Sequence, residues 1–122
     1  MNPWFAVFLG GGLGSMARFG VSYLTTSRFT KINPEGTLIS NILATAVLAI
    51  VLYYFHEKEP LSNGMKAFVI TGFCGGFSTF STFSYETIEL IKHHNYLYGI
   101  ANVLISIFLA VLILYFISKW VS

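Results

Sequence analysis

A chain of 122 residues is short enough for a single domain. Its residues are 55% hydrophobic and only 10% charged, and its mean hydropathy is +0.70. Soluble domains carry about 25% charged residues, so this composition excludes a water-soluble globule, and the high apolar content excludes disorder. One cysteine excludes an intrachain disulfide and a cysteine-rich zinc site, and a net charge of +2 indicates no nucleic-acid-binding surface. The composition indicates a membrane protein.

Charge-free runs divide the chain into four hydrophobic segments. Each is close to the ~20 residues that a helix needs to cross a hydrocarbon core of about 30 Å, and a helix satisfies its own backbone polar groups in lipid. We therefore predict an all-α membrane protein with one transmembrane domain over residues 1–122 and helices at about 3–25, 36–56, 66–92 and 95–120. No basic leader precedes the first run, so we expect no cleaved signal peptide.

The first predicted helix contains Arg18, the one charged residue within it. An ionisable residue at such a depth is a candidate for function, or its side chain extends to the interface. Two roles therefore stay open for Arg18: an anchor at the membrane surface, or electrostatics in the vestibule of a pathway. The glycines at 12 and 14 formally match a dinucleotide-binding fingerprint. Because the βαβ context is absent, we interpret them as positions of close helix packing.

The basic residues are balanced between the two sides of the membrane. With four spans, one side carries Lys58, Lys66 and Lys119, and the other carries Arg28, Lys31 and Lys92. Topology is normally set by a bias of Lys and Arg toward one side, and here almost no bias exists. The balance predicts insertion in both orientations, which permits an antiparallel dimer with a two-fold axis in the membrane plane.

The third predicted helix departs most from a plain membrane span. Gly75 and Gly76 lie near the middle of its charge-free part, and phenylalanines alternating with hydroxyl residues follow them. This pattern predicts a break at about 75–79, because unwound backbone is tolerated in a membrane where it is buried or lines an aqueous cavity, and broken helices mark ion sites in transporters. The alternative interpretation is a small-residue packing face formed by Gly72 and Gly76.

Three motifs together carry a family resemblance. They are GFCGGFSTFSTF at 72–83, GGLGSMAR at 11–18 and GTLISN at 36–41. With these motifs in this order, and over essentially its whole length, the chain resembles the small bacterial fluoride channels of the CrcB or Fluc family. The resemblance implies a multi-pass protein of the bacterial plasma membrane, a dual-topology antiparallel homodimer that lets fluoride leave the cell passively and so relieves its toxicity.

The resemblance also implies which residues form the fluoride path and the cation site. The fluoride path would be lined by two rings, one amide and three hydroxyls: Phe80, Phe83, Asn41, Ser81, Thr82 and Ser106. Carbonyl oxygens of Gly75 and Ser78 would hold a structural Na⁺ on the dimer axis. The family usually has threonine at the position of Ser78, and a backbone ligand should make that difference mild. The family varies at the position of Asn102, whose role stays open.

The chemistry of these residue types suits a small, strongly hydrated anion. Amide N–H and hydroxyl groups can replace water as donors, and the edge of a phenylalanine ring carries positive potential. No Lys or Arg lies in the middle of the second, third or fourth span, so an anion would not be trapped by a full charge, as conduction requires. For Phe80 and Phe83 taken alone, the competing interpretation is core packing.

A small proton-coupled multidrug exporter is the main rival, because it also has four helices and balanced charge. Proton coupling needs a carboxylate within the membrane. Here the first acidic residue is Glu35, in a predicted loop, and Glu86 and Glu89 lie toward the end of the third span. A non-conducting assembly subunit would leave the hydroxyl-rich segment unexplained. We expect no enzyme, since no span holds a nucleophile with a nearby base.

Overall fold

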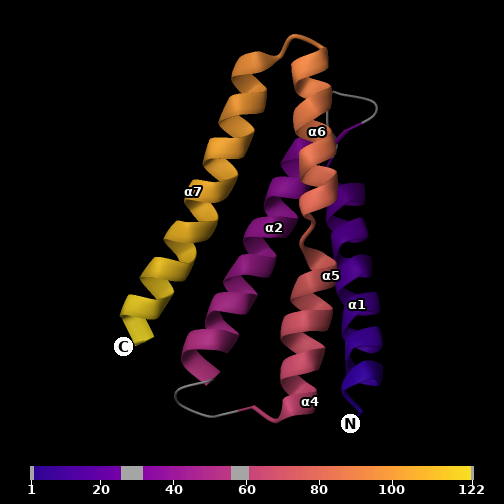
Figure 1. Ribbon diagram of the computed structural model, residues 1–122, viewed down its shortest axis with the longest axis vertical. Helices are drawn as coiled ribbons and strands as arrows, with labels where there is room; N and C mark the ends of the chain where they lie inside the picture. Colours follow the sequence, from indigo (N-terminus) through magenta and orange to yellow (C-terminus); the bar gives the residue numbers. More distant parts are fainter. Residues whose placement is uncertain (1, 26–31, 56–60, 122) are drawn as a thin grey trace.

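The computed structural model describes residues 2–25, 32–55 and 61–121. These residues form helices joined by short connections, and no strand occurs among them, which confirms the all-α prediction. The bundle is elongated, and both chain termini lie at the same end of it (Figure 1). One helix, α2, packs between α7 and the third hydrophobic segment, which in turn packs along α1.

The helix bounds follow the hydrophobic segments closely. They are α1 Pro3–Leu24, α2 Pro34–Ala49, the π-helical η1 Ile50–Phe55, α4 Asn63–Lys66, the π-helical η2 Ala67–Cys74, α5 Gly75–Phe77, α6 Phe80–Lys92 and α7 Tyr96–Val121. Within the described parts of the chain, three continuous helices are long and apolar enough to cross a membrane: Pro3–Leu24, Pro34–Tyr53 and Tyr96–Trp120. The third segment is divided into two shorter helices that follow one another along the bundle (Figure 1).

Capping side chains set where two of the helices begin. The side chain of Asn33 accepts a hydrogen bond from the Gly36 N–H at 3.1 Å, and Pro34 occupies the first helical position, where its missing N–H costs nothing. The Ser62 hydroxyl accepts from the Met65 N–H at 3.2 Å. The second and third segments therefore become helical at 34 and 63, earlier than the predicted 36 and 66.

Glycines bring α1 into backbone contact with the third segment. A Cβ on Gly10 would collide with the carbonyl oxygen of Phe68, and one on Gly14 would collide with that of Phe73. From the other side, a Cβ on Gly72 would lie 2.9 Å from the Gly10 Cα, and one on Gly76 would lie 2.6 Å from the Gly11 carbonyl oxygen. Backbones that approach this closely gain dispersion contacts that lipid cannot replace. The packing face of Gly72 and Gly76, given above as the alternative interpretation, is therefore present in the structure.

Asn33 connects three helices at the end of the bundle away from the termini. Its side-chain amide donates to the backbone oxygen of Thr25 at 2.9 Å and to its hydroxyl at 2.8 Å. Its backbone N–H donates to Glu86 Oε2 at 3.0 Å, and nearby the Tyr98 hydroxyl donates to Glu35 Oε1 at 2.6 Å. Glu86 is only 2% exposed. The Glu86 carboxylate therefore connects α6 to the start of α2, and the Glu35 carboxylate connects α2 to α7.

The described lysines lie at both ends of the bundle. Lys66 in α4 and Lys119 in the last turn of α7 share the end that carries the two termini (Figure 1). Lys92, the last residue of α6, lies at the opposite end. The remaining loop cations in the charge count, Arg28, Lys31 and Lys58, lie outside the described residues.

The glycine contacts predict a strong difference between two alanine substitutions in α1. Gly14→Ala should destabilise the protein by about 1–3 kcal/mol, because the new methyl group has no space against the third segment. Gly12→Ala is the matched control, since nothing lies within 4 Å of its added Cβ, and there alanine should be neutral or gain up to about 1 kcal/mol of helix propensity. Unfolding in detergent measures both, and equal midpoints would contradict the packing described above.

Candidate functional site

The third segment is interrupted at Ser78 and Thr79. Ser78 has φ −86° and ψ 159°, and Thr79 has φ −153° and ψ 125°, so both residues are extended between α5 and α6. Gly75 and Gly76 remain helical in α5. The interruption lies within the range 75–79 that the sequence pattern indicated, but the glycine pair is a packing feature and the hydroxyl residues after it form the break.

Asn41 of α2 satisfies the backbone of the break. Its side-chain oxygen accepts from the Thr79 N–H at 2.7 Å, and its side-chain N–H donates to the Thr79 carbonyl oxygen at 3.2 Å. An extended residue inside a membrane would otherwise leave both groups without partners, each at a cost of several kcal/mol. The two bonds therefore make this extended geometry possible. Asn41 has a structural role that the sequence did not reveal.

Two carbonyls at the break lose the donors that a continuous helix would provide. The Thr79 N–H would bond to the Gly75 oxygen but bonds to Asn41 instead. The Thr82 N–H would bond to the Ser78 oxygen but bonds to the Thr79 hydroxyl, at 3.2 Å, as the cap of α6. Gly75 and Ser78 line a cavity of about 200 Å³. Carbonyl oxygens released in this way fit a hard monovalent cation such as Na⁺.

Arg18 of α1 also bonds to the third segment at the break. Its Nε donates to the Gly76 carbonyl oxygen at 3.1 Å, and in a continuous helix that oxygen would accept from the Phe80 N–H. The guanidinium therefore caps the C-terminal end of α5, where the helix dipole places partial negative charge. The side chain is directed toward the break and is only partly exposed, which favours the vestibule interpretation of Arg18 over the surface anchor.

A cavity of about 290 Å³ opens beside the break, between α2, α6 and α7. It is lined by Asn41, Thr45, Ser78, Thr79, Phe80, Phe83, Ser106, Ile107 and Ala110. None of these described lining residues carries a charge. The polar groups are one amide and hydroxyls, and the rest of the wall is aromatic or aliphatic.

Four of the six residues predicted for the fluoride path meet in this cavity: Asn41, Phe80, Phe83 and Ser106. The two rings lie with centroids 6.1 Å apart and planes tilted by 43°, and Phe80 is 80% exposed at the surface of the single chain. The remaining two, Ser81 and Thr82, lie in the first turn of α6 but do not line the cavity.

Two polar residues of the cavity wall, Thr45 and Thr79, were not among the predicted site residues. Thr45 follows Asn41 by one helical turn, so the two share a face of α2, and its hydroxyl donates to the Asn41 carbonyl at 2.7 Å. That spacing was visible in the sequence, whereas the part played by the Thr79 backbone was not. Asn102, left open above, is 6% exposed on α7 and does not line the cavity.

Ser106 and the start of α6 provide unused donor capacity at the cavity. The Ser106 Oγ is buried and has no hydrogen-bond partner among the described residues. The N-terminus of α6, a helix of 13 residues beginning at Phe80, carries the positive end of its dipole. A hydroxyl donor together with the positive end of a helix dipole is complementary to a small anion. The described residues contain no cluster of three or more His, Cys, Asp or Glu side chains for a metal ion.

Comparison with known proteins gives a consistent match along the chain. Residues 5–117 match the family described as CrcB-like protein, Camphor Resistance (CrcB). A protein of Clostridium perfringens named fluoride-specific ion channel FluC is 39% identical over 101 residues, which cover 83% of this chain and 79% of the relative. Fluoride-specific ion channel FluC 1 of Yersinia pestis is 38% identical over 106 residues, covering 87% and 83% respectively. FluC of Escherichia coli O1:K1 / APEC is 39% identical over 103 residues, covering 84% and 81%.

The pairing of Asn41 with Thr79 predicts that the break depends on this one side chain. Asn41→Leu should destabilise the protein by about 2–4 kcal/mol, because two buried backbone groups lose their partners, and it should accelerate exchange of the Thr79 amide hydrogen. Thr45→Val is the control, since it removes only a hydroxyl bond within α2. Hydrogen exchange followed by mass spectrometry measures the effect. An unchanged Thr79 amide in the Asn41 variant would show that other groups hold the break.

Proposed function

The chain belongs to the CrcB family, and from this premise we propose that it is a fluoride channel through which F⁻ crosses the membrane down its gradient. One observation supports this function above all others. A cavity at a helix break in the membrane presents an amide, hydroxyls and two phenylalanine rings, and no charged side chain among its described lining residues. The chain acts as a channel and not as an enzyme.

The cavity can replace the water around fluoride with neutral donors. Fluoride is small and strongly hydrated, so leaving water requires compensating hydrogen bonds. The unpartnered Ser106 hydroxyl is one donor, and the Asn41 amide has a second N–H beyond the one bonded to Thr79. Neutral donors bind an anion less tightly than a lysine or arginine would, so the ion can also leave, as conduction requires.

The two phenylalanines provide selectivity for anions without a fixed charge. The edge of each ring carries positive electrostatic potential and its face carries negative potential, so an anion is attracted to an edge. Phe80 and Phe83 occupy the same cavity wall and are tilted relative to each other, and in the proposed path their ring edges would face the ion. A cation passing the same edges would be repelled.

The rival exporter mechanism lacks its essential group. Proton coupling needs a carboxylate in the substrate pathway. The described lining of the cavity includes none, and the buried carboxylate of Glu86 accepts from the Asn33 N–H at a helix end. The relatives reported above are named as fluoride-specific channels.

The working protein is an antiparallel homodimer with both orientations in the bacterial plasma membrane. Balanced Lys and Arg residues support dual insertion. Phe80 is 80% exposed in the single chain and its cavity is open to one side, so a second copy would complete the wall. Ser81 and Thr82 in the first turn of α6 would extend the path from the cavity.

A structural Na⁺ on the dimer axis would hold the two copies together. The Gly75 and Ser78 carbonyls, deprived of their helical donors, would be its ligands in each chain. Two carbonyls from one chain leave a cation undercoordinated, so matching carbonyls from a second copy are needed. The ion would supply fixed positive charge and cross-link the two broken helices, and Arg18 donates a hydrogen bond to the neighbouring Gly76 oxygen in each chain.

Fluoride flux from reconstituted liposomes tests the proposed function directly. Vesicles loaded with fluoride should release it quickly without a proton gradient, and vesicles loaded with chloride should not release chloride. In the same assay Phe83→Ile should slow fluoride release by about tenfold or more, since loss of a ring edge removes roughly 1.4 kcal/mol of anion stabilisation.

Phe8→Ile is the matched control for that variant, because Phe8 lies on α1 and is 73% exposed, away from the cavity. It should conduct like the unmodified protein. Release that requires a proton gradient would contradict the channel function and support an exporter. Unchanged flux in the Phe83 variant would show that the ring only packs.

Removal of sodium should weaken assembly. Protein prepared with N-methyl-D-glucamine in place of Na⁺ should show a smaller dimer fraction by size-exclusion chromatography with light scattering, and returning Na⁺ should restore it, because the released carbonyls lose their ligand. A dimer fraction independent of Na⁺ would overturn the cation site. Monomers under both conditions would overturn the dimer itself, whatever the result of the flux assay.

A further inference from the structure

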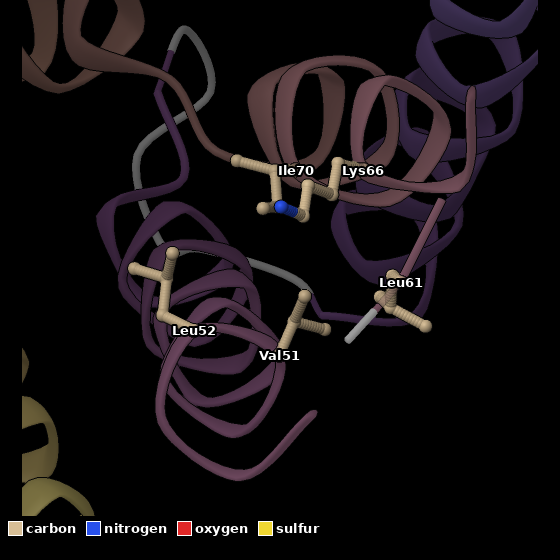
Figure 2. Close-up of a pocket in the computed structure, with 5 residues that line it drawn as sticks. All are labelled: Val51, Leu52, Leu61, Lys66 and Ile70. Atoms are coloured by element: carbon tan, nitrogen blue, oxygen red, sulfur yellow. The ribbon is translucent and has the colours of Figure 1, made fainter. Parts of the chain in front are cut away.

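A second apolar pocket lies at the end of the bundle that carries the termini. Its volume is about 160 Å³, and it lies between η1 and the helix that begins with α4. Four aliphatic side chains and one lysine line it: Val51, Leu52, Leu61, Ile70 and Lys66 (Figure 2). Figure 2 shows Lys66 running toward Ile70, with its nitrogen beside the space between the two helices. The conduction cavity shares none of these residues.

Two tryptophans indicate the depth of this pocket in the membrane. Trp4 in the first turn of α1 is 85% exposed, and Trp120 in the last turn of α7 is 82% exposed. Both turns lie at the end of the bundle where α4 begins (Figure 1). Exposed tryptophans gather at the level of lipid headgroups. The pocket therefore lies where the headgroups meet the acyl chains.

The chemistry of the pocket fits a lipid better than water. A water molecule needs two to four polar partners, and an aliphatic pocket with one polar group cannot provide them. The stem of Lys66 is partly buried along the pocket, and no carboxylate oxygen of a described residue lies within 4.0 Å of its ammonium group. A cation above an aliphatic pocket at headgroup depth is complementary to a negatively charged headgroup on a hydrocarbon chain.

We propose that this pocket binds one anionic phospholipid of the surrounding bilayer. The upper part of an acyl chain lies against Val51, Leu52 and Ile70, and the lipid phosphate pairs with the Lys66 ammonium group. Because the site is formed by η1 and α4 with η2, an occupying lipid bridges the end of the second segment and the start of the third. The pocket shares Ile70 with the cavity beside Gly75 and Ser78, but lipid binding in it does not require fluoride conduction.

Lipid titration followed by native mass spectrometry tests the site. Purified protein in detergent is titrated with phosphatidylglycerol or with phosphatidylcholine, and the one-lipid adduct is counted. The unmodified protein should prefer phosphatidylglycerol. Lys66→Met keeps the aliphatic stem without the charge and should reduce that preference about fivefold, the size expected for one lysine near an anionic surface. Leu52→Trp should fill the pocket and reduce binding of both lipids.

Lys119→Met is the matched control, because Lys119 lies at the same end of the bundle but stands over the Tyr115 ring, at 5.8 Å from its centroid. It should keep the preference for phosphatidylglycerol. Equal losses in the two lysine variants would indicate general surface charge and overturn the site, as would an unchanged preference in Lys66→Met. Fluoride flux from each variant verifies that it is folded.

Discussion

The reciprocal hydrogen bonds between Asn41 and Thr79 are the interaction on which the rest of the structure depends. A membrane offers no water to unpaired backbone groups, so a helix can open at mid-membrane only where the protein supplies replacements. One asparagine on α2 supplies both a donor and an acceptor to one extended residue. An amide is suited to this task because it carries both functions side by side, as a peptide group does.

Asn41 provides hydrogen-bond partners only for the backbone of Thr79, so other polar groups around the break remain available. The Thr79 hydroxyl caps α6 by accepting from the Thr82 N–H, which in a continuous helix would bond to the Ser78 carbonyl. The Thr79 N–H bonds to Asn41, whereas in a continuous helix it would bond to the Gly75 carbonyl. Two cavities therefore lie beside the break, and Thr45 and Ser78 line both of them. No described residue in the wall of either cavity carries a charged side chain.

The glycine contacts and Arg18 hold the first half of the third segment in place. Gly10 and Gly14 let α1 approach until the backbones touch, so α5 ends at a fixed position relative to α1. At that end Arg18 bonds to the Gly76 carbonyl, which has lost its helical donor. A charge inside a membrane is costly unless it has partners, and here a helix C-terminus supplies one. The cavity beside the break therefore lies next to a fixed scaffold.

The amino-acid sequence by itself determined the membrane class, the number and extent of the hydrophobic segments, and the hydroxyl-rich region where the third one opens. Those properties depend on composition and on neighbours a few residues apart, which local rules describe. Only the tertiary structure decided that the helix opens at Ser78 and Thr79 instead of at the glycine pair, that Arg18 turns inward, and that Thr45 joins the cavity wall. The physical reason is that the partners come from distant segments, Asn41 lying 38 residues from Thr79 and Arg18 lying 58 from Gly76, and such pairs exist only once the helices have packed.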